Sequence, residues 1–233
     1  MRSFQFYLVS TPIGNLDDLS SRAVDVLGSV DIVLAEDTRK AKVLLGRHGI
    51  DTEVRSFHDH NKERVTPSII RQLEGGKSVA LVADAGTPVI SDPGYYLVRK
   101  LIEQGIEITS IPGASAVTTA LVLSGLPPDR FTFYGFIPRK RGAREQVILE
   151  AGKSRGTGLF FESPRRLIGT LEAIGELLGD REVVVARELT KVHEEVCRGS
   201  AAILLEHFRR HGVRGEITIL IRGVGRRRGS GTA

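Results

Sequence analysis

Short apolar runs alternate with amphipathic segments along almost the whole chain. The runs at Phe6–Ser10, Asp31–Glu36 and Val79–Ala83 are typical of strands that are buried on both faces. Apolar residues at helical spacing separate them, for example over Asp17–Gly28 and over a shorter stretch at Pro67–Glu74. Such alternation favours a mostly parallel sheet covered by helices. We therefore expect an α/β protein.

The second half repeats this alternation with fewer elements. The segment "GLPPDR", residues 125–130, is dense in residues that end helices and strands, and is the best linker candidate. The strands expected after it lie near 131–137, 157–162, 182–187 and 216–221, and the helices near 143–151, 165–178 and 200–211. The sequence therefore predicts two α/β domains with a boundary between about 112 and 128, assigned as residues 1–115 and 116–223. It also predicts a basic Gly/Ser-rich tail, 224–233, that is disordered.

Composition restricts the class of protein. With 41% apolar and 26% charged residues, the chain has the balance of a soluble globular protein. No apolar stretch approaches the ~18 residues that span a bilayer, and the N-terminus lacks the features of a secretory signal, so a cytoplasmic location is expected. Cys197 is the single cysteine, which excludes an internal disulfide and a multi-cysteine metal site. No metal is expected.

Positive charge is concentrated in two places. The formal net charge is +5 and the sequence pI is about 9.5, which favours a polyanionic partner. The segment "PRKRGAR" carries Arg139, Lys140, Arg141 and Arg144, and three further arginines lie in the tail. A solvated surface without a partner is the alternative interpretation of each cluster.

The segment "VADAGTPVISDPG", residues 82–94, follows a predicted parallel strand. Ligands of open α/β sheets bind at the carboxyl ends of such strands. Neither GxxxxGK[ST] nor GxGxxG occurs in the chain. Gly86 permits close approach to the backbone and Pro88 stiffens it, while Asp84 and Asp92 offer carboxylates to ribose hydroxyls or a cation. The alternative is a tight turn that only reverses the chain.

Seven motifs together carry a resemblance to a known family. In order they are "STPIGNLDDLS" at 10–20, "AEDTRK" at 35–40, "SFHDHN" at 56–61, "DAGTPVISDPG" at 84–94, "IPGASAV" at 111–117, "FFESPRRL" at 160–167 and "ARELTKVHEE" at 186–195. The chain resembles the tetrapyrrole methylases, and most closely their branch of ribosomal small-subunit methyltransferases I, the 16S rRNA cytidine-2′-O-methyltransferases. The resemblance extends over about residues 4–223, and the combination is far more specific than any single motif.

The resemblance implies that S-adenosylmethionine (SAM) binds in a cleft between the two α/β domains. It also implies that 16S rRNA of the small ribosomal subunit is the partner and that the protein is a homodimer. This chain has Thr87 where tetrapyrrole enzymes of the family carry an acidic residue, and this difference makes a tetrapyrrole substrate less expected. The residues expected to contact the cofactor are Pro12, Asp84, Ala85, Gly86, Thr87, Ile90, Asp92, Ser115, Ala116, Phe161 and Glu162.

A ribose hydroxyl is a poor nucleophile at neutral pH, so a nearby base would assist methyl transfer to it. The candidates for this base lie at predicted strand ends and are Glu36, Asp37, His58 and His60. Arg39 could bind a phosphate or orient a carboxylate. Asp37 could instead cap the next helix, and both roles can coexist. The histidines, two residues apart, would point to one side of an extended segment, with a surface pair as the alternative.

Two further arginines, Arg165 and Arg166, follow a predicted strand and are expected to contact RNA phosphates, with a surface ion pair as the alternative. Two other functions remain open from the sequence. One is a C-methyltransferase of a tetrapyrrole, and the other is a SAM-responsive RNA-binding module without catalysis.

Overall fold

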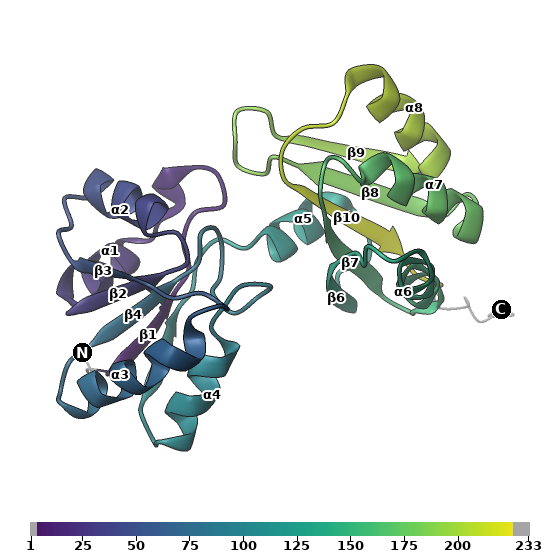
Figure 1. The fold of residues 1–233 in the computed structure, drawn as a ribbon. Coiled ribbons are helices and arrows are strands. Elements are labelled where there is room, and N and C mark those ends of the chain that lie inside the picture. The colour runs from purple at the N-terminus through teal and green to yellow at the C-terminus, as the bar shows by residue number, and fades with distance from the viewer. Residues whose placement is uncertain (1–3, 226–233) are drawn as a thin grey trace, which may run out of the picture. The chain divides into compact units, whose positions relative to one another are not determined.

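The computed structural model describes residues 4–225 (Figure 1). The chain divides into two compact units between Ser115 and Ala116. Within the described residues, each unit contains one five-stranded sheet with helices packed on it, so the expected α/β class is confirmed. The predicted disordered tail falls largely on residues 226–233, which lie outside the described part of the chain.

The N-terminal unit contains a parallel sheet with the strand order β3-β2-β4-β1-β5. Its elements are β1 (Phe6–Val9), α1 (Ser21–Ser29), β2 (Ile32–Ala35), α2 (Thr38–Arg47), β3 (Glu53–Ser56), α3 (Lys62–Glu74), β4 (Val79–Val82), α4 (Tyr95–Glu103) and β5 (Ile108–Ile111). The central strand β4 pairs with both β1 and β2. Because all five strands are parallel, the loops that follow them meet at one edge of the sheet.

Helices cover both faces of this sheet, as the continuous apolar strands predict. Leu27 of α1 and Leu44 of α2 pack with Val9 and Val33 on one face. On the other face, α3 and α4 pack against the neighbouring strand residues. Figure 1 shows α1 and α2 on one side of the sheet and α3 and α4 on the opposite side. All four residues of β2 and of β4 are buried, which explains their unbroken apolar runs.

Two helix boundaries in this unit differ from the sequence expectation. The helix predicted from Asp17 is split, because Leu16–Asp18 forms a separate 3-10 turn and the Ser20 side chain accepts a hydrogen bond from the Ala23 amide to cap α1. The helix predicted from Pro67 begins earlier, at Lys62, so this proline lies inside α3. A proline read as a helix start therefore misplaced that boundary by more than one turn.

The C-terminal unit contains a mixed sheet with the order β6-β7-β10-β8-β9. Its elements are α5 (Ala116–Ser124), β6 (Phe131–Phe136), α6 (Arg141–Lys153), β7 (Thr157–Glu162), α7 (Leu167–Leu178), β8 (Glu182–Arg187), β9 (Glu195–Ser200), α8 (Ala201–His211) and β10 (Ile217–Arg222). Helices α6, α7 and α8 cover one face, and α5 packs against β8, β9 and β10. Among residues 4–225, no helix is long and apolar enough to cross a membrane.

The sheet of the C-terminal unit is mixed, although its alternation of strands and helices resembles that of the parallel N-terminal sheet. Within the described part of this unit only β6 and β7 pair in parallel, while β10 inserts antiparallel between β7 and β8. Strand β9, which the sequence analysis did not predict, pairs antiparallel with β8 at the edge of the sheet. It is only half-buried and partly polar, so it lacks the apolar run that identifies a central strand.

Candidate functional site

Backbone hydrogen bonds join the loops that follow β1 and β4. The Thr11 amide donates to the Gly86 carbonyl at 2.9 Å, and the Gly86 amide donates to the Thr11 carbonyl at 3.0 Å. The Thr11 hydroxyl also donates to the Ala83 carbonyl at 3.1 Å. The Thr87 hydroxyl lies 3.1 Å from that of Ser10 and 3.3 Å from the carbonyl of Ala114, which follows β5. Three strand-end loops are therefore held together at the edge where ligands of such sheets bind.

The loop after β4 has an unusual backbone. Gly86 has a φ of 83°, and a Cβ added there would lie 3.4 Å from Ile13 Cγ2. Val89 and Ser91 also have positive φ values, 76° and 64°, which non-glycine residues seldom adopt. Residues held in such conformations cluster at functional sites. The strain favours the ligand-binding interpretation of residues 82–94 over a turn that only reverses the chain.

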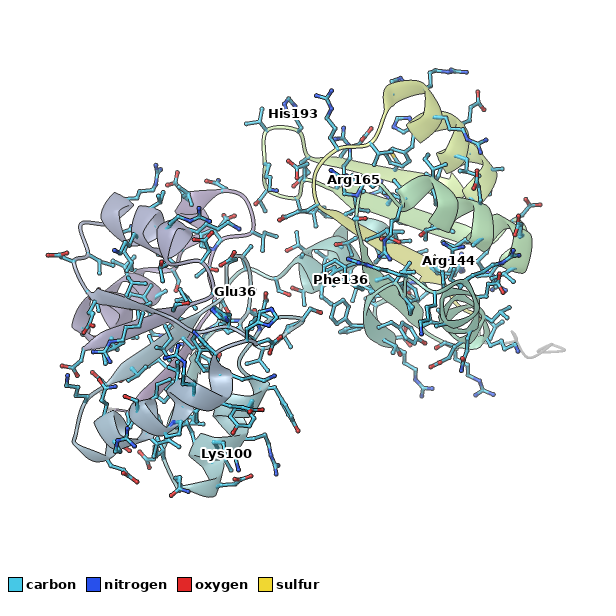
Figure 2. The ribbon with its side chains drawn as sticks, in the orientation of Figure 1. Glu36, Lys100, Phe136, Arg144, Arg165 and His193 are labelled. Atoms are coloured by element: carbon cyan, nitrogen blue, oxygen red, sulfur yellow. The ribbon has the colours of Figure 1, made fainter. Side chains whose placement is uncertain are left out.

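Three carboxylates form an acidic corner at this edge, namely those of Glu36, Asp84 and Asp92. Asp84 Oδ1 accepts a hydrogen bond from the Asp37 amide at 3.0 Å, and Asp84 Oδ2 binds Lys40 Nζ at 2.8 Å. Burial, together with repulsion by the Glu36 and Asp84 carboxylates, raises the pKa of Asp92 to about 6. Glu36 follows β2 and is exposed (Figure 2). The acidic corner would therefore be stabilised by a cationic ligand.

Asp37 caps helix α2, which is one of the two roles that the sequence allowed. Its Oδ1 accepts a hydrogen bond from the Arg39 amide at 2.9 Å. The Arg39 guanidinium binds both carboxylate oxygens, at 3.0 and 2.7 Å. These hydrogen bonds hold the pKa of Asp37 well below its usual range. A carboxylate so stabilised accepts a proton poorly, so the geometry disfavours Asp37 as a general base.

His58 and His60 lie in a turn before α3, not in the extended segment that was expected. The turn forms because the His58 carbonyl accepts hydrogen bonds from the Asn61 and Lys62 amides, and the Asn61 side chain accepts one from the His58 amide. The two rings still meet edge to face, with centroids 5.9 Å apart. His58 Nδ1 is buried and has no hydrogen-bond partner among the described residues. A buried polar atom without a protein partner can form a hydrogen bond with a ligand.

A pocket of about 510 Å³ opens beside the joined loops. Its polar lining includes the predicted residues Asp37, Arg39 and Asp84, and the predicted Pro12 also lines it. The lining residues that the sequence analysis missed are Thr11, Leu16, Ala35, Lys40, Ala41, Val43, Leu44, Val82 and Ala83. Val43 is 67% exposed although apolar, which indicates a binding surface on α2, but the sequence alone does not distinguish it from the buried leucines that follow it. The volume is in the range of small-molecule sites.

The remaining predicted cofactor contacts of the N-terminal unit lie near these loops in sequence. Ala85 and Thr87 are half-buried, and Ile90 is exposed. Ser115 is half-buried and directly precedes α5, whose first residue is Ala116. Their contact with the cofactor stays a prediction.

In the C-terminal unit, Glu162 is enclosed by its own neighbours. The Ser163 amide and the Thr170 hydroxyl each donate to its carboxylate at 2.7 Å, and Arg166 Nη2 lies 2.5 Å from it. Arg166 also donates to the Ile137 carbonyl at 2.9 Å. Glu162 and Arg166 thus form an internal network at the start of α7, which accounts for both residues without a cofactor or an RNA phosphate.

The other predicted basic residues are more accessible. Arg139, Lys140 and Arg141 are exposed between β6 and α6, and Arg141 pairs with Glu145 at 2.6 Å. Two other residues were predicted to contact RNA: Arg144 is half-buried, and Arg165 is exposed (Figure 2). Phe161 packs edge to face against Phe133 and Phe136, with ring centroids 4.8 and 5.5 Å apart.

One cluster of possible metal ligands was not anticipated. Ligand atoms of Glu195, Cys197 and His207 lie within 4.8 Å of one another. However, Arg187 Nε binds Glu195 at 2.5 Å, and His207 Nε2 lies 2.8 Å from the same carboxylate. Burial and the carboxylate raise the pKa of the Cys197 thiol to about 11, so the thiol stays protonated at neutral pH. The neighbouring guanidinium disfavours a metal cation at this cluster.

Known proteins share this fold and much of this sequence. A family model described as Tetrapyrrole (Corrin/Porphyrin) Methylases matches residues 5–204. A protein of Thermotoga maritima named Ribosomal RNA small subunit methyltransferase I is 45% identical over 216 residues, which are 93% of this chain and 97% of that protein. A protein of the same name from Mesorhizobium japonicum is 48% identical over 92% of this chain and 74% of that protein.

Solved structures with lower identity share the fold. A cobalt precorrin-4 methyltransferase has a TM-score of 0.70 at 20% identity, with 93% of this chain and 94% of that chain covered. The uroporphyrin-III-C-methyltransferase of Thermus thermophilus has a TM-score of 0.64 at 19% identity, with 93% of each chain covered. These findings confirm the resemblance carried by the seven motifs. The chain belongs to the tetrapyrrole methylase family, and within it to the branch of ribosomal RNA small subunit methyltransferases I.

Proposed function

We propose that this protein transfers a methyl group from SAM to the ribose 2′-hydroxyl of a cytidine in 16S rRNA of the small ribosomal subunit. Membership of a methyltransferase family supports the reaction class, and the names of the closely similar relatives support an rRNA substrate. One observation supports the proposal most directly: hydrogen bonds join the loops after β1, β4 and β5, and the loop after β4 has the strained backbone around Gly86.

The residues at this edge fit SAM. Gly86 has no side chain that would keep a ligand away from its backbone, and its φ of 83° is one that other residues rarely adopt. SAM carries a positive sulfonium, which would offset the repulsion between Asp92 and the carboxylates of Glu36 and Asp84. We therefore assign SAM to the loops around Thr11 and Gly86. When bound, SAM supplies an electrophilic methyl group, and the protein supplies position and electrostatics.

The proton of the reacting hydroxyl needs an acceptor close to the acidic corner. Asp37 is a weak base because Arg39 stabilises its charged form. Asp92 is a stronger one, since its raised pKa of about 6 lies nearer to the operating pH, and His58 has a buried ring nitrogen without a partner in the described chain. We propose that the acceptor is one of Glu36, His58 and Asp92, with His60 beside His58 in a positioning role.

Nucleoside mass spectrometry of 16S rRNA tests the substrate. A strain that lacks this protein should lack one 2′-O-methylcytidine, and the wild-type gene should restore it. Purified protein with labelled SAM should then methylate small subunits from that strain. Retention of every 2′-O-methylcytidine in the deletion strain would refute the RNA assignment. Label transfer to uroporphyrinogen III instead of RNA would favour the tetrapyrrole alternative, whereas SAM binding with no transfer would favour a non-catalytic module.

We further propose that the protein is a cytoplasmic homodimer, because its substrate is part of the ribosome and because the motifs resemble a family whose members often dimerise. Light scattering after size-exclusion chromatography tests the oligomeric state. A monomeric mass at working concentration would refute the dimer.

A further inference from the structure

Four phenylalanines gather on one side of strands β6 and β7. Phe131, Phe133 and Phe136 come from β6 and Phe161 from β7. Register partners in neighbouring strands point to the same side, and Phe136 is paired with Phe161. Both Phe133 and Phe136 contact the Phe161 ring edge to face. Phe131 is 46% exposed and Phe136 is 59% exposed, so this aromatic face is accessible.

A β-bulge creates the aromatic face. Phe133 pairs with Leu159 and Phe136 with Phe161, so three steps along β6 match two steps along β7. Gly135 supplies the extra residue with a φ of 73°, a conformation that suits glycine. If β6 alternated regularly through residues 134 and 135, Phe136 would point to the opposite side, where Tyr134 stacks on a core phenylalanine. The local irregularity thus adds a third aromatic side chain of β6 to the open side.

Exposed cations follow directly where β6 ends. Arg139 and Lys140 are exposed and make no ion pair with any residue in the range 4–225, whereas Arg141 pairs with Glu145. Figure 2 shows Phe136 on β6 and Arg144 on α6, the helix that this basic segment enters. Large exposed aromatic surface beside unpaired cations is complementary to a ligand with flat apolar rings and negative charge.

We propose that the aromatic face of Phe131, Phe133, Phe136 and Phe161 stacks against unpaired bases of the RNA substrate, while Arg139 and Lys140 contact adjacent phosphates. This inference rests on the proposed RNA substrate and specifies how that substrate is held. Aromatic side chains on an open sheet stack on the bases of single strands, because every base has an aromatic face. Paired bases inside a duplex cannot stack on them, so the inference selects a single-stranded segment.

The two contact types predict different salt behaviour. Phe136→Ala should weaken binding of a short cytidine-rich single-stranded RNA by about 5- to 150-fold, at every salt concentration, because stacking releases no counterions. The slope of log affinity against log salt should stay that of the wild type. Lys140→Ala should instead reduce that slope by ~0.7, the value for one phosphate contact on a single strand.

Matched variants separate stacking from general apolar packing. Phe136→Tyr keeps an aromatic ring and should retain binding, whereas Phe136→Leu keeps apolar surface without a ring and should lose it. Ile203→Ala removes an apolar side chain that is 61% exposed on α8, away from β6, and should leave RNA affinity unchanged. Circular dichroism of each variant excludes unfolding, and light scattering records the oligomeric state.

The proposal is overturned if Phe136→Ala binds RNA as the wild type does, or if Phe136→Leu binds as well as Phe136→Tyr. It is also overturned if the Phe136 variants dissociate a dimer, because the face would then belong to a second copy of the chain. Equal losses of SAM and RNA affinity would place Phe136 with the cofactor and overturn it too. Failure of the proposed function looks different, since the wild-type protein itself would then neither bind nor methylate the RNA.

Discussion

Replacement of Asp92 by asparagine should stabilise the protein at neutral pH. Burial and the carboxylates of Glu36 and Asp84 raise the pKa of Asp92 from 3.8 to about 6. The folded protein therefore holds this proton up to a higher pH than the unfolded chain does. Between these two pKa values, the free energy of unfolding falls as pH rises, and the whole loss is present above the folded pKa. Asp92→Asn removes the charge and hence the loss.

The pKa shift of Asp92 determines how large the gain in stability should be. A shift of about two units corresponds to at most ~3 kcal/mol, at ~1.4 kcal/mol per unit. Asp92 is only half-buried, and solvent screens its repulsion by Glu36 and Asp84, so the expected gain at neutral pH is about 1 kcal/mol. For a chain of this size, such a gain raises the melting temperature by roughly 2–4 °C.

Urea unfolding of Asp92→Asn and the wild type from about pH 4 to about pH 8 measures this difference directly. The two proteins should have similar stability at the acidic end and should separate as pH rises. Asp51→Asn, which changes an exposed aspartate outside the acidic corner, is the matched control and should show no such separation. An Asp92→Asn variant that is no more stable at pH 8 than the wild type, or that gains equally at pH 4, would refute the proposed repulsion.

Three further variants test other parts of the site. Asp37→Ala should lower the free energy of unfolding by ~1 kcal/mol through loss of the helix cap. Asp37→Asn can still cap the helix and should change the rate of methylation little. A fall in turnover of ~10²-fold in the asparagine variant would indicate that Asp37 is the base after all. Glu162→Ala should cost about 3 kcal/mol, against ~1 kcal/mol or less for the exposed Glu172→Ala, and equal costs in urea unfolding would contradict the internal network. Gly86→Val should weaken SAM binding in calorimetry by ~10-fold or more. Gly49→Val is the control, because it has the same kind of backbone strain but no atom within 4 Å of the added Cβ, and it should spare SAM binding. An unaltered affinity in folded Gly86→Val would exclude this loop from the SAM site.

The sequence predicted the N-terminal sheet well because its signals are local. Strand β4 is an uninterrupted apolar run, and the glycines, prolines and aspartates after it mark a loop. The parallel direction followed from regular alternation with helices. The second sheet lacked such a signal, since β10 pairs with strands that are distant in sequence and the edge strand β9 is partly polar.

The sequence predicted which loops form the site better than it predicted the role of each residue in them. The resemblance implied that Glu162 contacts the cofactor, but did not reveal that Thr170 and Arg166 of its own unit bind its carboxylate. The sequence identified Asp37 with two possible roles, and the two contacts of the Arg39 side chain with its carboxylate favour the capping role. The aromatic face was missed because strict alternation along β6 places Phe136 on the opposite side, and the bulge at Gly135 reverses that placement.

The position of β4 also determines when this unit can begin to fold during synthesis. β1 and β2 do not pair with each other, because β4 lies between them and hydrogen-bonds to both. A nascent chain that ends before Val79 therefore has two open strand edges in what will become the middle of its sheet, and such edges favour aggregation. When β4 leaves the ribosome it closes both edges and delivers the loop of Gly86 to Thr11 in the same step. Pairing of β4 thus closes these two edges and assembles the framework of the site together, and β5 later covers the other edge of β1.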